Sequence, residues 1–292
     1  MEANRTYLFC PGNHPRKVEK VFDAGADVVI LDLEDAVAIA EKPATRAVAV
    51  EALKRPRKCR GYVRVNAYDT EYCYGDIQEI VGPWLDGIVL PKLESVDDMR
   101  SVDWLLGNLE RERGLPVGSI DVMPIIETAR GQDAVRAIAQ AGTRIKRLSF
   151  GAGDYTKDLG IEWSLEETEL ASMRAEMVVA SRLGNLEAPI DTVFIHIREN
   201  EHFLASCNLV RDLGFQGKLC IYPGQIPIAN GAFTPPEEQV AWARKIIAAF
   251  AEAEAAGSAS IQIDGYFVDY PIVDKAQRII DIAEAIARAE AA

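Results

Sequence analysis

Two carboxylates follow short apolar runs and are candidates for holding a metal ion. Glu127 comes directly after Pro124–Ile126, and Asp154 follows the glycine-rich turn at 151–153. Taken singly, each has an ordinary structural interpretation, as an acid near a helix N-terminus or as a turn aspartate. The two acids end neighbouring predicted strands, so their side chains can converge on one ion. Two carboxylates with waters and substrate oxygens are the usual ligands of Mg²⁺, and no cluster of His and Cys accompanies them to favour zinc.

A cationic side chain lies inside another apolar run. Arg64 belongs to Tyr62–Val65, and a buried arginine needs anions or acceptors around it. One interpretation is a structural ion pair with Asp32 or Glu34. The other is a fixed cation for a substrate carboxylate or a developing enolate. Asp32, Glu34 and Asp35 form a local triplet of acids, and we expect at least one to pair with a cation while the others hold metal-bound waters.

Basic residues gather near the N-terminus of an otherwise acidic chain. They form either a solvated helix face or a phosphate-binding rim. The group consists of Arg5, His14, Arg16, Lys17, Lys20, Lys42 and Arg46.

Short apolar runs alternate with longer helical patterns along the chain. Most runs are continuous, as expected of strands covered on both faces. We predict strands at Tyr7–Cys10, Val28–Asp32, Tyr62–Val65, Gly87–Leu90, Val122–Ile126, Arg147–Phe150, Thr192–Ile197 and Lys218–Ile221. Eight strands with crossover helices predict an α/β fold of the (β/α)8 TIM barrel type. A doubly wound open sheet is the alternative, but no GxGxxG motif follows the first strand.

In such barrels the active site lies at the carboxyl ends of the strands. The predicted strands finish in charged residues or glycine, as at Asp32–Asp35, Pro91-Lys92, Glu127 and Gly151–Asp154. This pattern predicts one shared polar pocket.

The C-terminal part of the chain lies outside the eight predicted βα units. After the break at Ala255–Ser260, Asp264-Gly265 separates two apolar runs and predicts a hairpin, and a helix follows over about Pro271–Ala291. We therefore expect a catalytic barrel over residues 1–255 and a hairpin-plus-helix extension over 256–292. This extension either caps its own barrel or packs on a neighbouring subunit.

Composition excludes several functional classes. The net charge of −13 argues against a nucleic-acid surface, which needs a basic stripe. No run approaches the ~18 apolar residues of a membrane span, and the first residues lack the apolar core of a signal peptide. The five cysteines are scattered and form no CxxC pair, which is typical of reduced thiols. We expect a cytoplasmic protein without nucleic-acid or membrane partners.

Several segments together resemble a known family. They are Arg5–Asn13, Gly25–Val37, Val63–Asn66, Leu90–Lys92, Ile125–Thr128 and Phe150–Asp154. In order and spacing, the chain resembles over nearly its whole length the citrate lyase β-subunit-like proteins. These belong to the wider group of HpcH/HpaI aldolases and of malyl-CoA and citramalyl-CoA lyases.

The resemblance implies a (β/α)8 barrel that forms a homo-oligomer, often a trimer or hexamer. It implies Mg²⁺ on Glu127 and Asp154, and an Arg64 that orients or polarises the reacting carbonyl. From the residues themselves, Asp32 and Glu34 of the acid triplet are catalytic candidates. Gly153 is a substrate-binding candidate, because a glycine-rich turn lets the backbone approach a ligand closely.

The resemblance also assigns the surrounding residues. The basic N-terminal region, with Arg5, Arg16 and Lys20, is implied to meet the phosphates of coenzyme A. In the CoA-ester lyases of the family a C-terminal lid brings an aspartate over a neighbouring active site, and Asp269 matches that position. Its alternative interpretation is the N-cap of the last helix.

Two positions depart from the family pattern. Tyr222 replaces a common histidine near the eighth strand, and His196 replaces a common aspartate near the seventh. Both positions bear on the acyl substrate more than on the metal chemistry.

The expected activity is Mg²⁺-dependent cleavage of a 3-hydroxyacyl-CoA, such as citramalyl-CoA, malyl-CoA or citryl-CoA, into acetyl-CoA and a 2-oxo acid. One alternative is a pyruvate-type class II aldolase that acts without CoA. The other is a non-catalytic citrate-lyase-like subunit.

Overall fold

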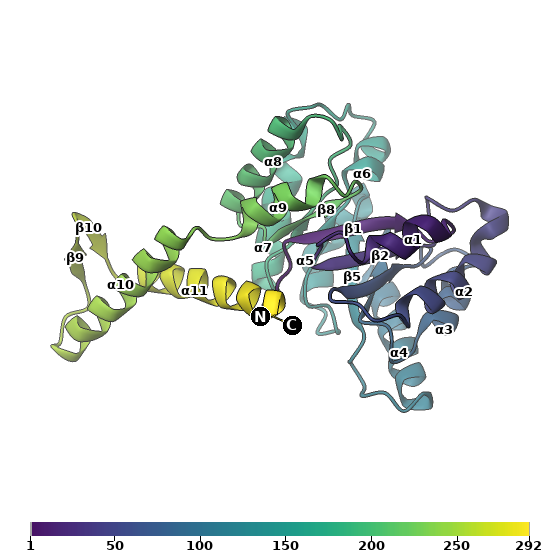
Figure 1. Ribbon diagram of the computed structural model, residues 1–292, viewed down its shortest axis with the longest axis horizontal. Coiled ribbons are helices and arrows are strands. Elements are labelled where there is room, and N and C mark those ends of the chain that lie inside the picture. The colour runs from purple at the N-terminus through teal and green to yellow at the C-terminus, as the bar shows by residue number, and fades with distance from the viewer. Residues whose placement is uncertain (1, 292) are drawn as a thin grey trace. The chain divides into compact units, whose positions relative to one another are not determined.

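The computed structural model describes residues 2–291. Eight strands form a closed barrel in which each strand is parallel to its neighbours and β8 pairs with β1 (Figure 1). The strands are β1 (Thr6–Pro11), β2 (Val28–Asp32), β3 (Arg60–Arg64), β4 (Gly87–Leu90), β5 (Asp121–Ile126), β6 (Ser149–Phe150), β7 (Ile190–Asp191) and β8 (Gly217–Cys220). The predicted TIM barrel is confirmed.

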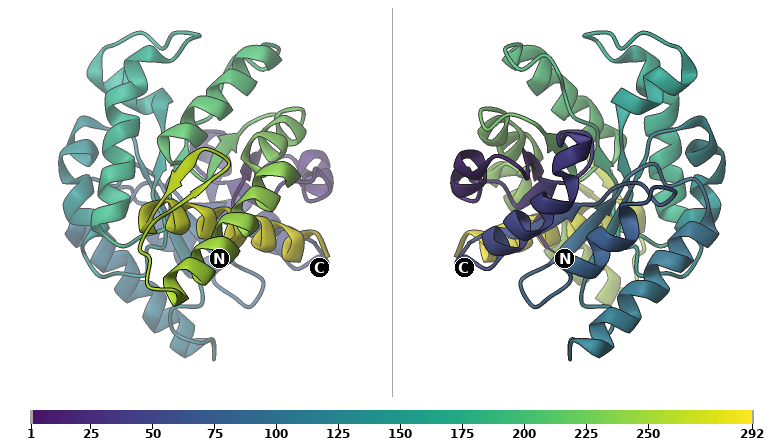
Figure 2. Two further views of the ribbon diagram at one scale, coloured as in Figure 1. Left: turned by 90° about the vertical axis from the view of Figure 1, so that its left-hand side faces the viewer. Right: turned by 90° about the vertical axis from the view of Figure 1, so that its right-hand side faces the viewer.

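Helices follow the strands and surround the barrel (Figure 2). They are α1 (Pro15–Val21), α2 (Lys42–Leu53), α3 (Cys73–Ile80), α4 (Val96–Glu112), α5 (Ala129–Ala139), α6 (Ala152–Leu159), α7 (Ala171–Leu183), α8 (Asn200–Leu213) and α9 (Gln225–Phe233), with 3-10 turns η1 (Ile39–Glu41) and η2 (Thr168–Leu170). Two N-termini are capped by side chains, because Ser95 accepts a hydrogen bond from the Asp98 N–H and Thr128 from the Gly131 N–H.

Alternate residues of the strands fill the barrel interior. The inner layer contains Tyr7, Val28, Ile30, Tyr62, Val89, Met123, Ile125, Ile190 and Leu219. Because side chains on a strand alternate between its faces, the other residues of each strand face the helices. The same alternation decides which of the residues that follow the apolar layer along each strand also point into the barrel.

A polar cluster closes the amino end of the barrel, and we call it the floor. Its members are Tyr62, Asp121, Arg147 and Glu187. The Tyr62 hydroxyl donates to Asp121 Oδ2 at 2.5 Å, Arg147 also donates to Asp121, and Arg147 Nε donates to Glu187 Oε2 at 2.7 Å. The side chain of Arg147 is fully buried.

One strand was predicted in the wrong place. The seventh strand is Ile190–Asp191, whereas the predicted segment Thr192–Ile197 is a loop. Asp191 is buried and pairs with Lys218 and Arg174, so a charged residue ends the strand while the apolar run continues beyond it.

The C-terminal residues form a second compact unit. Residues 4–230 cluster as the barrel unit, while residues 231–291 cluster with residues 2–3. The second unit contains α10 (Glu237–Ala255), the antiparallel hairpin of β9 (Ile261–Ile263) and β10 (Tyr266–Val268), and α11 (Tyr270–Ala291). The predicted hairpin-plus-helix extension is confirmed. By compactness α10 also belongs to this unit, so the division falls earlier than the expected boundary after residue 255.

The C-terminal unit has a core of its own. Phe250 and Ile246 of α10 pack with Val268 of β10 and with Ala276 and Ile279 of α11. Helices α10 and α11 lie against each other (Figure 1).

Among residues 2–291, no helix is long and apolar enough to cross a membrane.

Candidate active site

Three predicted site residues share the inner face of the barrel. Asp32 follows Val28 and Ile30 at intervals of two, and Arg64 stands two residues after Tyr62. In the same way Glu127 continues the alternation of Met123 and Ile125. A strand's period of two therefore places all three above the apolar layer, at the carboxyl ends of β2, β3 and β5. We call this end of the barrel, with the loops that follow its strands, the mouth.

Arg64 is held by two carboxylates and an aromatic ring. Its Nε and Nη2 donate to Asp32 Oδ1 and Oδ2 at 2.7 and 2.6 Å, and its Nη1 lies 3.2 Å from Glu34 Oε2. The guanidinium carbon lies 4.9 Å from the centre of the Phe9 ring. This forked pairing fixes both the position and the plane of the guanidinium. Both interpretations of Arg64 therefore stay open: it forms the structural ion pair, and it does so inside the mouth.

The pKa values of the two carboxylates beside Arg64, Asp32 and Glu34, are shifted in opposite directions. Burial alone would raise the pKa of Asp32, but the charge and hydrogen bonds of Arg64 outweigh burial and lower it. The pKa of Glu34 is raised because burial prevails over Arg64 and Lys92. Asp32 is therefore the fixed anionic partner of Arg64.

Glu127 is a buried carboxylate with a specific seat. Its Oε1 accepts a hydrogen bond from the Lys92 N–H at 2.8 Å, and a Cβ built on Gly151 would lie 2.3 Å from its Oε2. Glycine at 151 is thus required for the carboxylate to lie where it does. Burial raises the pKa of Glu127 to about 8, against the opposing charges of Lys92 and Arg64. Thr128, and not Glu127, caps α5.

Asp154 reaches the same region from the first turn of α6. It lies close enough to Glu127 to raise the pKa of that carboxyl, and its Oδ2 lies 3.2 Å from Lys92 Nζ. Its side chain is 23% exposed, so solvent reaches it. Gly153 precedes it in the same exposed turn. The structure thus places Glu127 and Asp154 around the same residue, Lys92, and their role as metal ligands stays a prediction.

Lys92 was not assigned a role from the sequence. It follows β4 with a left-handed backbone at φ 50°, and its Nζ lies 2.5 Å from Glu34 Oε1 and 3.5 Å from Asp35 Oδ2. Burial would lower the pKa of Lys92, but the neighbouring carboxylates raise it, with Glu34 contributing most. In the sequence, its signals were its place two residues after a predicted strand and its membership of the segment Leu90–Lys92, which resembles the family.

A second polar layer supports the mouth from the side of α2. Lys42 Nζ donates to the carbonyl oxygens of Leu33 and Glu34 and to Asn66 Oδ1, at 3.1, 2.7 and 2.6 Å. Asn66 in turn donates to Asp76, which also pairs with Arg46. Lys42 and Arg46 therefore hold the loops after β2 and β3 and do not form a phosphate-binding rim.

The other basic residues of the N-terminal group separate into two places. Arg5 is buried at the start of β1, where Nε and Nη2 donate to Asp27 at 3.1 and 2.9 Å. Arg5 directly precedes β1, and its partner Asp27 directly precedes β2. The pair therefore lies at the amino end of the barrel, away from the mouth. Arg16 and Lys20 lie exposed on α1, which follows the carboxyl end of β1. Arg16 and Lys20, but not Arg5, therefore lie on the helix that follows the carboxyl end of β1.

The remaining predicted residues lie in loops or in the other unit. His196 and Tyr222 are exposed in the loops after β7 and β8, and the ring of His196 contacts Phe194. Asp269 lies in the C-terminal unit at the start of α11, where its carbonyl oxygen accepts hydrogen bonds from the N–H groups of Ile272 and Val273. Its expected position over an active site stays a prediction.

The donor set of the mouth fits a hard divalent cation. Among residues 2–291, no group of three or more His, Cys, Asp or Glu side chains is arranged to hold a metal ion by itself. A pair of carboxylates is nevertheless what Mg²⁺ commonly takes from a protein, because it keeps several waters or substrate oxygens. The buried Glu127, whose pKa is raised by desolvation, and the partly exposed Asp154 supply such a pair.

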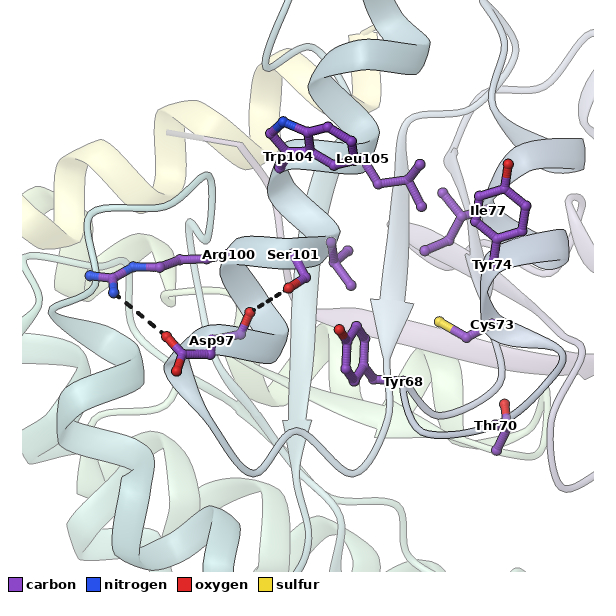
Figure 3. A pocket seen from close by; sticks show the side chains of 11 residues that line it. Tyr68, Thr70, Cys73, Tyr74, Ile77, Asp97, Arg100, Ser101, Trp104 and Leu105 are labelled. Atoms are coloured by element: carbon purple, nitrogen blue, oxygen red, sulfur yellow. Dashed lines mark hydrogen bonds and ion pairs between the residues drawn. The ribbon is translucent and has the colours of Figure 1, made fainter.

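A separate groove lies outside the barrel, between α3 and α4 (Figure 3). It encloses about 750 Å³, and exposed aromatic side chains form much of its wall. Its lining residues include Tyr68, Cys73, Tyr74, Ile77, Trp104 and Leu105. The one acid in its lining, Asp97, pairs with Arg100, so the groove carries none of the chemistry of the mouth.

Comparison with known proteins identifies the family. The model of the HpcH/HpaI aldolase/citrate lyase family matches residues 5–223, which span the whole barrel. The chain belongs to this family. It is 37% identical to the citrate lyase subunit beta of Leuconostoc mesenteroides subsp. cremoris, over 96% of this chain and 93% of that protein. It is 34% identical to the L-malyl-CoA/beta-methylmalyl-CoA lyase of Cereibacter sphaeroides, over 97% and 95%.

Solved structures of the family agree with the fold. The CitE protein of Mycobacterium tuberculosis, crystallised with magnesium, acetoacetate and coenzyme A, superposes with a TM-score of 0.77 at 30% identity, over 97% of this chain and 98% of that one. A citrate lyase beta subunit from M. tuberculosis, complexed with oxaloacetate and magnesium, gives a TM-score of 0.67 over 80% of this chain. The match to the CitE structure with coenzyme A therefore includes residues of both compact units of this chain.

Proposed function

We propose that the protein is a Mg²⁺-dependent carbon–carbon lyase. Its substrate is a 3-hydroxyacyl-CoA of the citramalyl-CoA, malyl-CoA or citryl-CoA type, and its products are acetyl-CoA and a 2-oxo acid. The observation that carries the proposal is the convergence of Glu127 and Asp154 beside Arg64 at the mouth. A buried acid whose ionised form is disfavoured without a cation stands next to a rigidly held guanidinium.

The reaction is a retro-Claisen cleavage. The substrate hydroxyl loses its proton, its oxygen becomes the carbonyl of the 2-oxo acid, and the carbon–carbon bond breaks. The electron pair of that bond passes to the thioester as an enolate, whose carbon then takes up a proton to give acetyl-CoA. Glu127 and Asp154 would hold a divalent cation, which would supply Lewis acidity to the hydroxycarboxylate part of the substrate.

Arg64 has the properties needed for the charged group at the thioester. Asp32 uses two of its five N–H donors, Nε–H and one on Nη2, and fixes the guanidinium plane. Preorganised donors of this kind stabilise negative charge as it develops, because no reorganisation is needed at the moment of reaction. We assign Arg64 to the developing oxyanion, and Asp269 to proton transfer at the enolate carbon.

Coenzyme A is assigned to the side of α1. Arg16 and Lys20 are exposed on this helix, directly after the carboxyl end of β1. They can meet phosphate groups at the edge of the mouth without burying their own charge. Similarity to a malyl-CoA lyase, and to a CitE structure that contains coenzyme A, supports this assignment.

The test is a mass-spectrometric search for condensation products. Purified protein is incubated with Mg²⁺, acetyl-CoA or propionyl-CoA, and glyoxylate, pyruvate or oxaloacetate, and new acyl-CoA species are identified by mass. We expect one pair to give a product that disappears in EDTA and in Glu127→Ala. Absence of any product from a folded protein that binds Mg²⁺ would refute the CoA-lyase assignment. Product formation by Glu127→Ala at the wild-type rate would refute the metal assignment.

A second candidate is a lyase subunit that acts only in a larger complex. Its support is the match to citrate lyase subunit beta over nearly the full length of both chains. It predicts no turnover by the isolated protein and tight binding to partner subunits in a pull-down. A CoA-independent aldolase would instead split a free hydroxy-oxo acid in the same assay without any acyl-CoA. The expected trimer or hexamer is checked separately by light scattering.

A further inference from the structure

Lys92 has an unusual backbone at the centre of the mouth. It stands two residues beyond β4 at φ 50°, a left-handed conformation that a residue with a long side chain seldom adopts. Such conformations persist only where the surroundings hold them, and they gather at functional sites. Here the contacts of Lys92 identify what holds it.

The two ends of Lys92 contact the two proposed metal ligands. Its backbone N–H donates to Glu127 Oε1 at 2.8 Å, and its ammonium nitrogen lies 3.2 Å from Asp154 Oδ2. The ammonium also lies 2.5 Å from Glu34 Oε1 and 3.5 Å from Asp35 Oδ2. One residue thus connects carboxylates that come from β2, β5 and α6.

The charge balance of the mouth gives this ammonium a special place. The acids Asp32, Glu34, Asp35, Glu127 and Asp154 face the cations Arg64 and Lys92. Arg64 is committed to its fork with Asp32 and to Glu34. Lys92 therefore neutralises the part of the cluster nearest Asp154, and three carboxylates surround its ammonium as they would surround a metal ion.

We propose that Lys92 is a positioning residue that serves as the resident counter-ion of the carboxylate cluster and is displaced from Asp154 by the divalent cation. This inference rests on the proposed function, because it takes Glu127 and Asp154 as the cation's ligands. The ammonium keeps the acids together in the metal-free protein. When the cation binds, the ion pair with Asp154 breaks while Glu34 and Asp35 retain the ammonium.

The proposal has a consequence opposite to that of a simple structural clamp. A counter-ion competes with the metal, so removing its charge strengthens cation binding and weakens the metal-free fold. A clamp only orients Asp154, so removing it weakens cation binding. The direction of the change in affinity therefore separates the two roles.

The experiment uses Mn²⁺ as the probe, with binding followed by calorimetry and by the electron paramagnetic resonance signal of free Mn²⁺. The variants are Lys92→Met and Lys92→Gln, the second of which keeps hydrogen-bond donors near Glu34. Lys157→Met is the matched control, because Lys157 also faces Asp154, at 3.9 Å, but its side chain is 84% exposed. Thermal unfolding is recorded with and without Mn²⁺.

We expect both Lys92 variants to bind Mn²⁺ about tenfold more tightly than wild type, since a like charge a few ångströms away has been removed. Their unfolding temperature falls without Mn²⁺ and rises more on its addition than that of wild type. The Lys157 variant binds Mn²⁺ within about twofold of wild type, since an exposed pair is largely screened.

Equal or weaker Mn²⁺ binding by the folded Lys92 variants overturns the counter-ion role while leaving the proposed function intact. Failure of the wild-type protein to bind Mn²⁺ overturns both. If Lys92→Met does not fold, the decision rests on Lys92→Gln by the same criterion.

Discussion

The two ends of the barrel are built from the same strands but differ in charge balance. At the floor, Asp121 and Glu187 share the fully buried Arg147, so two acids face one cation. At the mouth, the acids of β2, β5 and α6 outnumber Arg64 and Lys92. The floor thus has one acid more than its cations, whereas the mouth has three more. The small excess is compatible with a support of the fold, and the larger excess favours the binding of a cation from solvent. The difference teaches that charge balance, more than burial, separates a support from a site.

Breaking the floor is expected to have the largest effect on stability. In Arg147→Met, Asp121 and Glu187 lose their cation while the fully buried position stays filled. Removing one partner of a buried ion pair leaves an uncompensated charge, so the free energy of unfolding should fall by about 3–5 kcal/mol. Urea denaturation followed by circular dichroism measures it.

The control for this prediction is Arg136→Met. Arg136 pairs with Glu176 on the surface at 2.5 Å, so the number of charges lost is the same. Its unfolding midpoint should hardly change, because exposed pairs contribute little. Equal losses in the two variants would show that the floor is not a special network.

A substitution at the mouth should have the opposite effect to one at the floor: the protein should lose Mn²⁺ binding but keep its stability. Glu127→Gln removes one of the two proposed ligands, and Mn²⁺ affinity should fall by at least about a hundredfold, the upper range for residues that only support a ligand. The metal-free protein should not lose stability. Burial raises the pKa of Glu127 to about 8, so the fold already disfavours its ionised form at pH 7.

Calorimetric Mn²⁺ titration and urea denaturation of the same samples test both halves of this prediction. A variant that binds Mn²⁺ normally would remove Glu127 from the site. A variant that unfolds as readily as Arg147→Met would place Glu127 among the supports.

Asp32 shares features of both ends of the barrel. It lies at the mouth, but both of its carboxylate oxygens accept hydrogen bonds from Arg64, as in a structural ion pair. Its pKa is lowered, since the charge and hydrogen bonds of Arg64 outweigh burial. Asp32→Asn should therefore reduce the free energy of unfolding at pH 7 by about 2 kcal/mol, as for hydrogen bonds to a charged group. A carboxyl with a lowered folded-state pKa contributes above its ordinary value of 3.8, and the contribution is lost as pH falls further.

The stability gap between wild type and Asp32→Asn should thus be full at pH 6–7 and narrow below about pH 4. Urea denaturation across this range follows it. A gap that widens in acid would mean that Asp32 is not held as the anion of Arg64.

Much of the site could be predicted because an apolar run and the residue that ends it are local features of the sequence. Apolar residues at every second position of β2, β3 and β5 fix the inner face, so the polar residues that continue them must enter the mouth. Asp32 and Glu127 were found because they end or follow apolar runs, and Arg64 was found because it is a charged residue inside one. Asp154 was found because a glycine-rich turn followed by an acid is equally visible in one sequence.

The remaining residues depend on partners far away in the sequence. Arg5 was grouped with a phosphate rim by its neighbours in the chain, but its partner is Asp27 at the amino end of the barrel. Lys42 was grouped in the same way and holds the backbone after β2. Lys92 was passed over because its role comes from a left-handed backbone and from three carboxylates of other segments.

The smallest expected effect at the mouth comes from a substitution of Gly151, the glycine packed against the Glu127 carboxylate. In Gly151→Ala the added Cβ would lie 2.3 Å from Glu127 Oε2 and 2.8 Å from a side-chain carbon of Ile125, so the carboxylate must turn away from its seat. Because the ligand itself remains, Mn²⁺ affinity should fall only about tenfold, as for other residues that orient a ligand.

The control Gly107→Ala lies in α4, where the nearest atoms to a new Cβ are 3.7 Å away. It should keep wild-type affinity and gain slightly in helix stability. If both variants bind Mn²⁺ alike, Glu127 tolerates displacement, and the mouth does not depend on the position of this carboxylate in the way that the floor depends on Arg147.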